Sequence, residues 1–126
     1  ERQHSAGEGG GRVVHVTTLG TADPFPGFAA YAAAKAGAGS LIRSVKNEGA
    51  SIGVLGLAAA PGAVATAMLR GLFDESMVPT EMCLSPDEVG ALVAACAAGE
   101  RDAENGKTIY LTRGGDGRVE ERVAEA

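Results

Sequence analysis

Two apolar runs that each end in a loop, with a long alanine-rich segment between them, most strongly constrain the fold of this chain. The first run, residues 12–18 (RVVHVTT), is rich in β-branched residues, and the second, residues 53–60 (GVLGLAAA), is almost wholly apolar. Continuous apolar runs of this length are typical of strands buried on both faces, as in parallel sheets. Residues 28–48, between the runs, form a predicted helix with many Ala and Gly residues. This succession indicates an α/β fold.

Each predicted strand ends in residues that suit a binding site. Thr17 and Thr18 close the first run, and residues 19–28, with two glycines and two prolines, form a predicted loop. Pro61 and Gly62 close the second run in the same way, and a short helix is expected to start near Val64. Open α/β sheets bind their ligands at the carboxyl ends of the strands. We therefore expect a site at this edge of the sheet.

Tyr31 and Lys35, in the sequence YAAAK, are the chief candidates for chemistry at that edge. Residues four apart on a helix share one face, so an ammonium can lie against a phenol. A phenol is a weak acid with an ordinary pKa of about 10, and a nearby positive charge favours its ionised form. Such a pair can pass a proton to or from an alcohol oxygen. In many helices, however, a Tyr and a Lys at this spacing are only a packed ring and a solvated amine.

Further motifs, in order and spacing, resemble the second half of a short-chain dehydrogenase/reductase. Thr18 lies thirteen residues before Tyr31, and Pro61 lies thirty residues after it. The matching segments are VVHVTT for the strand with the active-site serine, YAAAK for Tyr-x-x-x-Lys, GVLGLAAAPGAVAT for Pro-Gly-x-x-x-Thr, SPDEVGAL for the start of the last long helix, and GKTIYLTRGG for the final strand. Together they span almost all residues from Gly10 to Gly115.

The resemblance implies a Rossmann-like, doubly wound parallel sheet. Residues 1–126 would be its C-terminal half, with about three strands and their flanking helices. The implied function is that of an NAD(P)-dependent oxidoreductase, which interconverts a small-molecule carbonyl and an alcohol. The cofactor would be NAD or NADP, and the choice between them belongs to the first half of the family's fold.

The resemblance also implies three catalytic residues. Tyr31 would donate a proton to the carbonyl oxygen as hydride arrives, Lys35 would hold the cofactor ribose, and Thr18 would hydrogen-bond the substrate oxygen. Thr18 stands where the family has serine, and its extra methyl group crowds the substrate carbonyl. His15 and Leu57 replace two asparagines that are common in the family.

Four further residues are implied to bind the cofactor together with Lys35. The backbone of Pro61, Gly62 and Val64 would hold the nicotinamide carboxamide. Thr66 would add a hydroxyl near the carboxamide or the pyrophosphate. The alternative for Pro61 and Gly62 is a turn that merely ends a strand.

The glycines near the start of the chain do not supply a pyrophosphate-binding turn. Gly7, Gly9, Gly10 and Gly11 precede a predicted strand, whereas a dinucleotide fingerprint follows a strand and opens a helix. We therefore predict that they connect a helix to a strand. The family's cofactor-selecting residue and its catalytic Asn also belong to the first half.

Composition limits the other classes of function. Eleven basic and sixteen acidic residues give a net charge of -5, without a Lys/Arg cluster, which disfavours nucleic-acid binding. No apolar stretch reaches the roughly 20 residues of a membrane helix, and no signal peptide is evident, so a cytoplasmic protein is expected. Cys83 and Cys96 have no metal-ligand spacing with the histidines, so no metal is expected.

Two kinds of partner follow from the predicted half-sheet. Strand 12–18 would lack a neighbour, which favours a homo-oligomer or a complementing N-terminal half. Helix 28–48 carries small residues that would let a second helix approach, namely Ala29, Ala33, Ala36, Gly37 and Gly39. The apolar segment 68–84 resembles the family's substrate lid, and the charged tail 116–126 is expected to fray or to form a short helix.

Two functions remain open at this stage. The chain is either an oxidoreductase half that works once the missing half completes it, or a non-catalytic module that associates with a related full-length enzyme. The retained Tyr31, Lys35 and Thr66 favour the first, and the missing cofactor turn favours the second for this chain taken alone.

Overall fold

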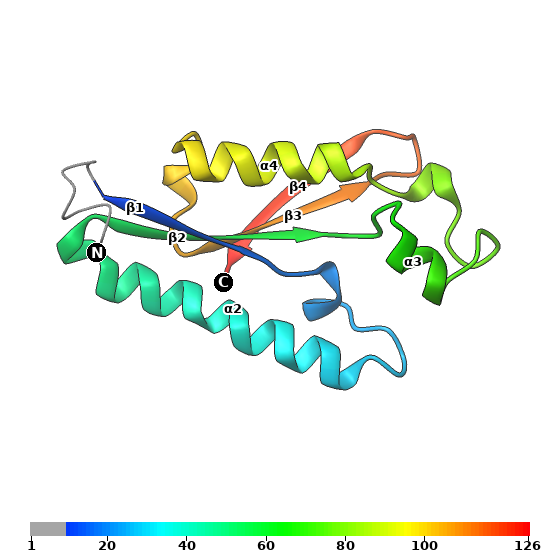
Figure 1. Cartoon of the computed structure of the whole chain (residues 1–126), viewed down its shortest axis with the longest axis horizontal. Helices are drawn as coiled ribbons and strands as arrows, with labels where there is room; N and C mark the ends of the chain where they lie inside the picture. The colour runs from blue at the N-terminus through cyan, green and yellow to red at the C-terminus, as the bar shows by residue number, and fades with distance from the viewer. Residues whose placement is uncertain (1–9) are drawn as a thin grey trace.

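The protein forms a four-stranded sheet with helices on both faces (Figure 1). The structure, a computed structural model, describes residues 10–126. Strands β1 (Gly11–Val16), β2 (Val54–Pro61), β3 (Lys107–Arg113) and β4 (Val119–Glu125) lie in the order β1-β2-β3-β4. The pairs β1–β2 and β2–β3 are parallel. The predicted Rossmann-like half-sheet is thus confirmed, although Gly7 and Gly9 of the glycine cluster lie outside the described residues.

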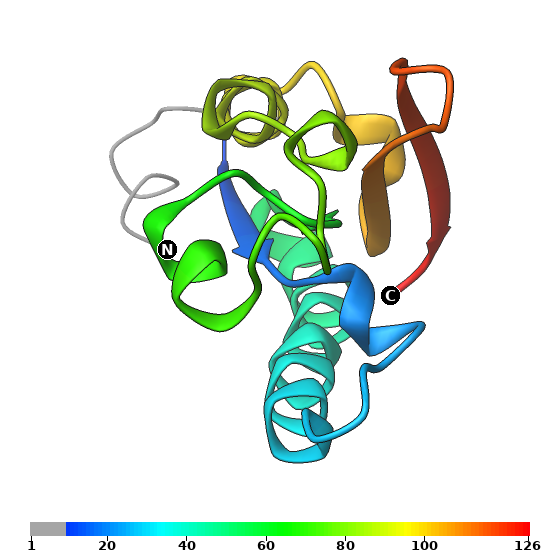
Figure 2. The ribbon, with the colours of Figure 1, turned by 90° about the vertical axis from the view of Figure 1, so that its right-hand side faces the viewer.

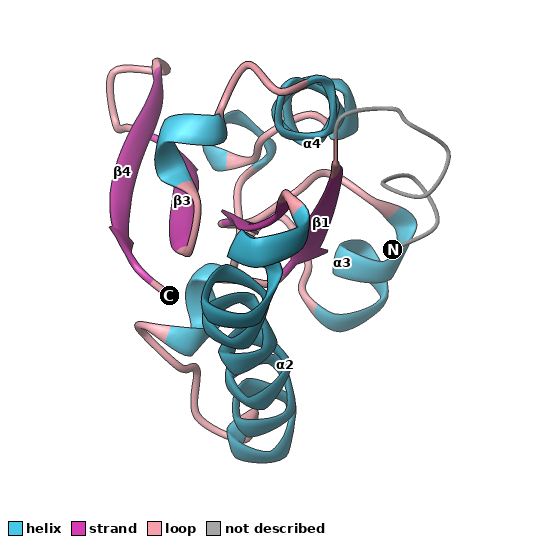
Figure 3. Ribbon diagram, turned by 90° about the vertical axis from the view of Figure 1, so that its left-hand side faces the viewer, coloured by secondary structure: helices cyan, strands magenta, loops and turns pink. Residues whose placement is uncertain are grey.

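Two long helices cover opposite faces of the sheet, as Figure 3 shows end-on. Helix α2 (Ala29–Gly49) lies on one face and α4 (Pro86–Ala98) on the other. The short helix α3 (Ala67–Leu72) lies beyond the carboxyl ends of the parallel strands (Figure 1). Single 3-10 turns η1 (Leu19–Thr21), η2 (Ala50–Ile52), η3 (Thr80–Met82) and η4 (Asp102–Glu104) complete the connections.

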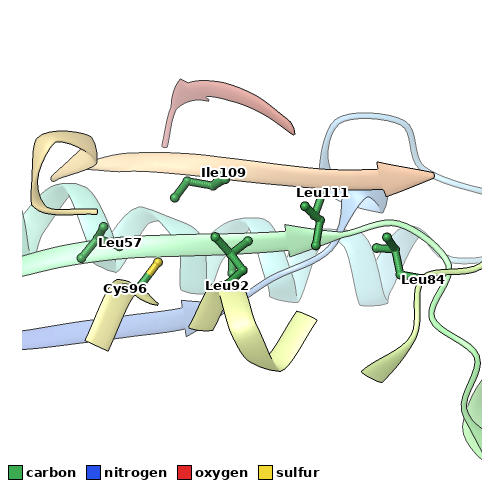
Figure 4. Packing of buried hydrophobic residues seen from close by; sticks show 7 residues of the cluster. Leu57, Leu84, Leu92, Cys96, Ile109 and Leu111 are labelled. Carbon is green, nitrogen blue, oxygen red and sulfur yellow. The ribbon is translucent and has the colours of Figure 1, made fainter. Parts of the chain in front are cut away.

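The main apolar core lies between the sheet and α4 (Figure 4). Alternate residues of β2 and β3 point to it, because successive side chains of a strand face opposite ways. Its members are no more than 6% exposed, and they are Leu57, Ala59, Leu84, Leu92, Cys96, Ile109 and Leu111. The middle of the other face of β2 carries only small residues toward α2, namely Gly56, Ala58 and Ala60. A Cβ atom added at Gly56 would come within 3.0 Å of the Ile42 carbonyl oxygen, so the helix packs closely there.

The C-terminal residues correct the expectation of a frayed tail or short helix. Residues 119–125 form strand β4, which pairs antiparallel with β3 along its whole length, from Lys107 with Glu125 to Arg113 with Val119. The turn before β4 contains Gly117 with a φ of 81°, a backbone conformation that glycine adopts without strain. Charged residues alternate poorly with apolar ones here, but an exposed edge strand needs few apolar contacts.

The opposite edge of the sheet is β1, whose only paired strand within residues 10–126 is β2. Two of its apolar residues, Val13 and Val16, are 43% and 42% exposed. The outer face of α2 is likewise open, and Leu41 there is 61% exposed. Ala36 and Gly39, two of the small residues expected to let a second helix approach, also line a cavity between α2 and the sheet.

Candidate active site

The predicted catalytic residues lie at the carboxyl edge of the parallel strands, which faces the viewer in Figure 2. Thr18 follows β1, and Tyr31 and Lys35 belong to the first turns of α2. The Lys35 Nζ atom donates a hydrogen bond to the Val16 carbonyl oxygen at 3.1 Å. This bond holds the Tyr31–Lys35 turn of α2 against Val16, the last residue of β1, which lies two residues before Thr18.

The Thr18 hydroxyl is already held in place by the chain. Its Oγ1 atom accepts a hydrogen bond from the Gly20 amide at 3.2 Å and so caps the 3-10 turn η1. The Thr18 carbonyl accepts one from the Thr21 hydroxyl at 2.9 Å. Within residues 10–126 no acceptor takes the Thr18 hydroxyl proton, so that proton is available to a substrate oxygen.

Tyr31 is 44% exposed and belongs to an aromatic cluster. Its ring meets Phe28 edge-on, with ring centroids 6.1 Å apart. Phe28 stacks on Phe73 at 5.8 Å, and Phe25 contacts Phe73 at 5.9 Å. Phe73 follows α3, so the cluster ties segment 68–84, the predicted lid, to the loop before α2. The sequence interpretation missed Phe25 and Phe28, although the three-residue spacing of Phe28 and Tyr31 already placed both on one side of the helix start.

Within the described part of the chain, Val64 is the one residue of the loop after β2 (residues 62–66) whose N–H and C=O both lack a hydrogen-bond partner. Val64 forms a parallel bridge with Leu84, in which Leu84 donates to Ala63 at 2.8 Å and accepts from Ala65 at 2.9 Å. The N–H and C=O of Val64 itself point away from this bridge and have no protein partner within the described part of the chain. A primary carboxamide needs one acceptor and one donor side by side, so Val64 suits such a group.

The other residues of this loop have structural bonds. The Gly62 amide donates to the Leu111 carbonyl at 2.8 Å, which joins the end of β2 to β3. Pro61 is buried at the end of β2 and has no N–H to offer. The Thr66 hydroxyl accepts from the Leu69 amide at 3.2 Å and caps α3. Among these residues Val64 is therefore the best placed to bind a carboxamide.

Arg113, which the sequence interpretation missed, ties the end of segment 68–84 to the start of α4 and to the turn before β4. Its guanidinium donates to the Cys83 carbonyl at 2.8 Å, the Gly117 carbonyl at 2.7 Å and the Glu88 carboxylate at 2.7 Å. The Ser85 backbone amide and Arg113 both hold the pKa of Glu88 below its ordinary value. Ser85 and Glu88 form a capping box at the start of α4, and the Ser-x-x-Glu pattern was the available signal.

Neither a cluster of metal ligands nor a long apolar helix occurs in residues 10–126. No group of three or more His, Cys, Asp or Glu side chains there is arranged to hold a metal ion. Across the same residues, the helices are too short or too polar to cross a bilayer.

Comparison with known proteins agrees with this arrangement. The family model described as short chain dehydrogenase matches residues 3–76. The chain is 31% identical over 112 residues to an acetoacetyl-CoA reductase of Allochromatium vinosum, covering 84% of this chain and 46% of that protein. It is 34% identical over 110 residues to a 3-oxoacyl-[acyl-carrier-protein] reductase of Vibrio cholerae, covering 82% and 45%. The chain thus spans less than half the length of these relatives.

Solved structures show the same fold. A 3-ketoacyl-(acyl-carrier-protein) reductase from Brucella melitensis, complexed with NADH, superposes with a TM-score of 0.77 at 21% identity, covering 93% of this chain and 48% of that one. A short chain dehydrogenase/reductase family protein superposes with a TM-score of 0.73 at 29% identity, covering 86% and 46%. With more than half of its residues matched by the family model, this chain belongs to the short-chain dehydrogenase family.

Proposed function

We propose that this chain supplies the proton-transferring half of an NAD(P)-dependent oxidoreductase, which interconverts a small-molecule carbonyl and an alcohol. An N-terminal half, in a longer chain or in a partner, would complete it. We base the proposal on one juxtaposition at the carboxyl edge: the Tyr31–Lys35 turn of α2 is bonded to the end of β1 beside Thr18, and Val64 offers free backbone groups one strand away. The relatives named above are reductases, which supports the same class of reaction.

The residues of this edge would act on the carbonyl oxygen in two ways. Tyr31 would donate its hydroxyl proton to that oxygen in reduction and take it back in oxidation. Thr18, whose hydroxyl is oriented by Gly20, would donate a second hydrogen bond to the same oxygen as negative charge develops on it. Lys35 has two ammonium protons left beyond its bond to Val16, and these would hold a ribose hydroxyl.

The free backbone of Val64 would bind the carboxamide of a nicotinamide ring. When bound, the nicotinamide supplies or accepts the hydride. Pro61, Gly62 and Thr66 would shape the loop that presents Val64, because Pro61 has no N–H, the Gly62 amide is bonded to β3 and the Thr66 hydroxyl caps α3. The aromatic cluster of Phe25, Phe28 and Phe73 would exclude water beside Tyr31.

Replacement of Tyr31 by Phe in the protein completed with its N-terminal half tests the function. The Tyr31→Phe ring keeps its contact with Phe28 and loses only the proton donor, so we expect hydride transfer to slow by about 10²–10⁴-fold while the cofactor still binds. Stopped-flow absorbance of NAD(P)H oxidation measures the step.

Tyr110→Phe is the matched control. Tyr110 is the only other tyrosine of the sequence and lies in β3, and the substitution removes the same hydroxyl while it keeps the ring that Arg122 covers. Turnover of Tyr31→Phe equal to that of the control would remove Tyr31 from the chemistry.

A further inference from the structure

Large apolar side chains are exposed at the end of the molecule where the parallel strands finish. Five of them come from the loop before α2 and from segment 68–84, and their exposed fractions lie between 53% and 74%; they are Phe25, Met68, Leu72, Met77 and Met82. Figure 1 shows α3 and both loops at this one end. We call these five residues the apolar patch. Exposed apolar surface gathered in one region of a protein commonly marks a binding site.

Aromatic contacts connect the apolar patch to Tyr31. The Phe25 ring contacts Phe73 at a centroid distance of 5.9 Å, Phe73 stacks on Phe28 at 5.8 Å, and Phe28 meets Tyr31 edge-on at 6.1 Å. Leu72 directly precedes Phe73 in the chain. A molecule that covers the patch would therefore have its apolar body beside the Tyr31 phenol.

Arg70 of α3 holds the following loop in place and is used up in doing so. Its guanidinium donates to the Val78 carbonyl at 2.7 Å, to the Thr80 hydroxyl at 2.9 Å and to the Cys83 sulfur at 3.8 Å. These bonds keep the loop that carries two methionines of the patch next to α3. The guanidinium is directed into the loop and not toward a ligand on the patch.

The charges around the apolar patch are mostly negative. Arg70 is the only basic residue in the two stretches 19–28 and 68–84. The same stretches contain four exposed carboxylates, namely Asp23, Asp74, Glu75 and Glu81. The ammonium group of Lys35 is bonded to the Val16 carbonyl. An anionic group on a bound molecule would thus meet repulsion here, whereas an uncharged apolar group would not.

We propose that the apolar patch binds the body of an uncharged alkyl ketone or of the corresponding alcohol. The inference rests on the proposed function for the reacting end, where the substrate oxygen would lie at Tyr31 and Thr18, and it adds the class of substrate. A substrate on an anionic carrier, such as a coenzyme A thioester, would bring phosphates toward the four carboxylates and is disfavoured.

The methionines report on this site directly, because all three methionines of the sequence belong to the apolar patch. The experiment titrates methyl hexyl ketone into the 126-residue chain and follows the isotope-labelled methionine methyl groups by NMR. We expect saturable shifts with a dissociation constant of about 1 mM. Methyl ethyl ketone, which lacks most of the alkyl chain, should bind about tenfold more weakly or worse. Octanoate, of the same length but charged, should bind about fivefold more weakly.

Leu72→Asp should weaken binding of methyl hexyl ketone about tenfold, because it puts a charge into the apolar patch. Leu41→Asp is the matched control, since Leu41 lies on the outer face of α2 and is 61% exposed, against 58% for Leu72. It should leave the affinity within about twofold, as expected for a surface change away from the site. Glu81→Gln leaves the patch apolar and should narrow the difference between the ketone and octanoate.

The measurement is independent of hydride transfer. Tyr31→Phe keeps the ring, so it should leave ketone binding within about threefold, even though the proposed function predicts that it loses turnover. Four results would overturn the proposal: no methionine shift at about five times the expected dissociation constant; octanoate binding as tightly as the ketone; equal losses for Leu72→Asp and Leu41→Asp; or shifts that follow protein concentration and not the ketone, which would mean that a second copy of the chain covers the patch.

Discussion

Thr18 combines a structural and a proposed catalytic task in one hydroxyl. Its oxygen caps η1 through the Gly20 amide, while its proton is left for a substrate. In the completed enzyme, Thr18→Ser should keep both bonds and turn over at least as fast, because it removes only the crowding methyl group. Thr18→Ala should lose one hydrogen bond to the developing charge and slow the reaction by about 10²-fold or more. Steady-state rates check this series; equal rates for Ser, Thr and Ala at position 18 would show that the hydroxyl is idle.

At the residue scale, sequence patterns indicated where the candidate site lies, but not which of its residues have polar groups free to bind a ligand. Helical spacing alone predicted that Tyr31 and Lys35 share one face of the helix. The predicted strand that ends at Thr18 then indicated that these three residues lie at the carboxyl edge of the sheet. The free N–H and C=O of Val64 could not be predicted, because they result from a tertiary bridge to Leu84, twenty residues along the chain. The same holds for Arg113, whose three partners come from separate segments.

At the scale of elements, the junction between α2 and β2 depends on the absence of a side chain at Gly49. A Cβ atom there would overlap the Val54 carbonyl oxygen, a backbone atom that cannot move aside cheaply. Gly49→Ala should therefore lower the free energy of unfolding by about 1–3 kcal/mol. Gly37→Ala is the matched control, since no atom lies within 4 Å of its added Cβ. It should raise stability by up to about 1 kcal/mol. Urea denaturation compares them, and equal effects would contradict the close packing.

The start of α4 should make stability depend on pH through Glu88. Its pKa in the folded state is lowered, first by the Ser85 amide and then by Arg113. A lowered pKa means that these interactions stabilise fully above the unfolded value of about 4.3 and are lost as pH falls through the folded value. Glu88→Gln should melt below the native protein at pH 7, and the gap should close below about pH 4.

Thermal melts at several pH values measure this gap. Glu100→Gln is the control, because Glu100 is exposed and forms no ion pair within residues 10–126. A gap for Glu88→Gln that stays constant from pH 7 to pH 3 would argue against the carboxylate as the stabilising group.

Sequence patterns predicted the parallel strands and long helices more reliably than the C-terminal strand. Strand 54–61 is a continuous apolar run that is largely buried on both faces, which made it recognisable. Strand 11–16 was recognised from its valines, although the expected burial on both faces is wrong, because Val13 and Val16 are exposed. Strand β4 has the sequence VEERVAE, whose side chains are mostly exposed, so its pairing with β3 comes from backbone hydrogen bonds and leaves little trace in composition. Residues 119–125 are therefore a strand because they pair with β3, and not because their side chains favour the strand conformation.

At the scale of the whole molecule, the proposed function gives this chain one end of a cofactor site. In that proposal Val64 and Lys35 would hold the nicotinamide and its ribose, whereas Gly10 and Gly11 lead into β1 and follow no described strand. In doubly wound folds the pyrophosphate binds a glycine-rich turn at a helix N-terminus, by several charge-assisted hydrogen bonds of ~1.5–3 kcal/mol each. Without them, affinity should fall by several orders of magnitude.

The most direct test asks whether the cofactor site is shared between this chain and an N-terminal half. It is calorimetry with NADH and NADPH, carried out on the 126-residue chain and on the protein completed with an N-terminal half. We predict no measurable binding of either cofactor at millimolar concentration by the isolated chain, and micromolar binding of at least one by the completed protein. Micromolar binding by the isolated chain as a monomer would contradict the account, because the cofactor site would then lie wholly within these residues.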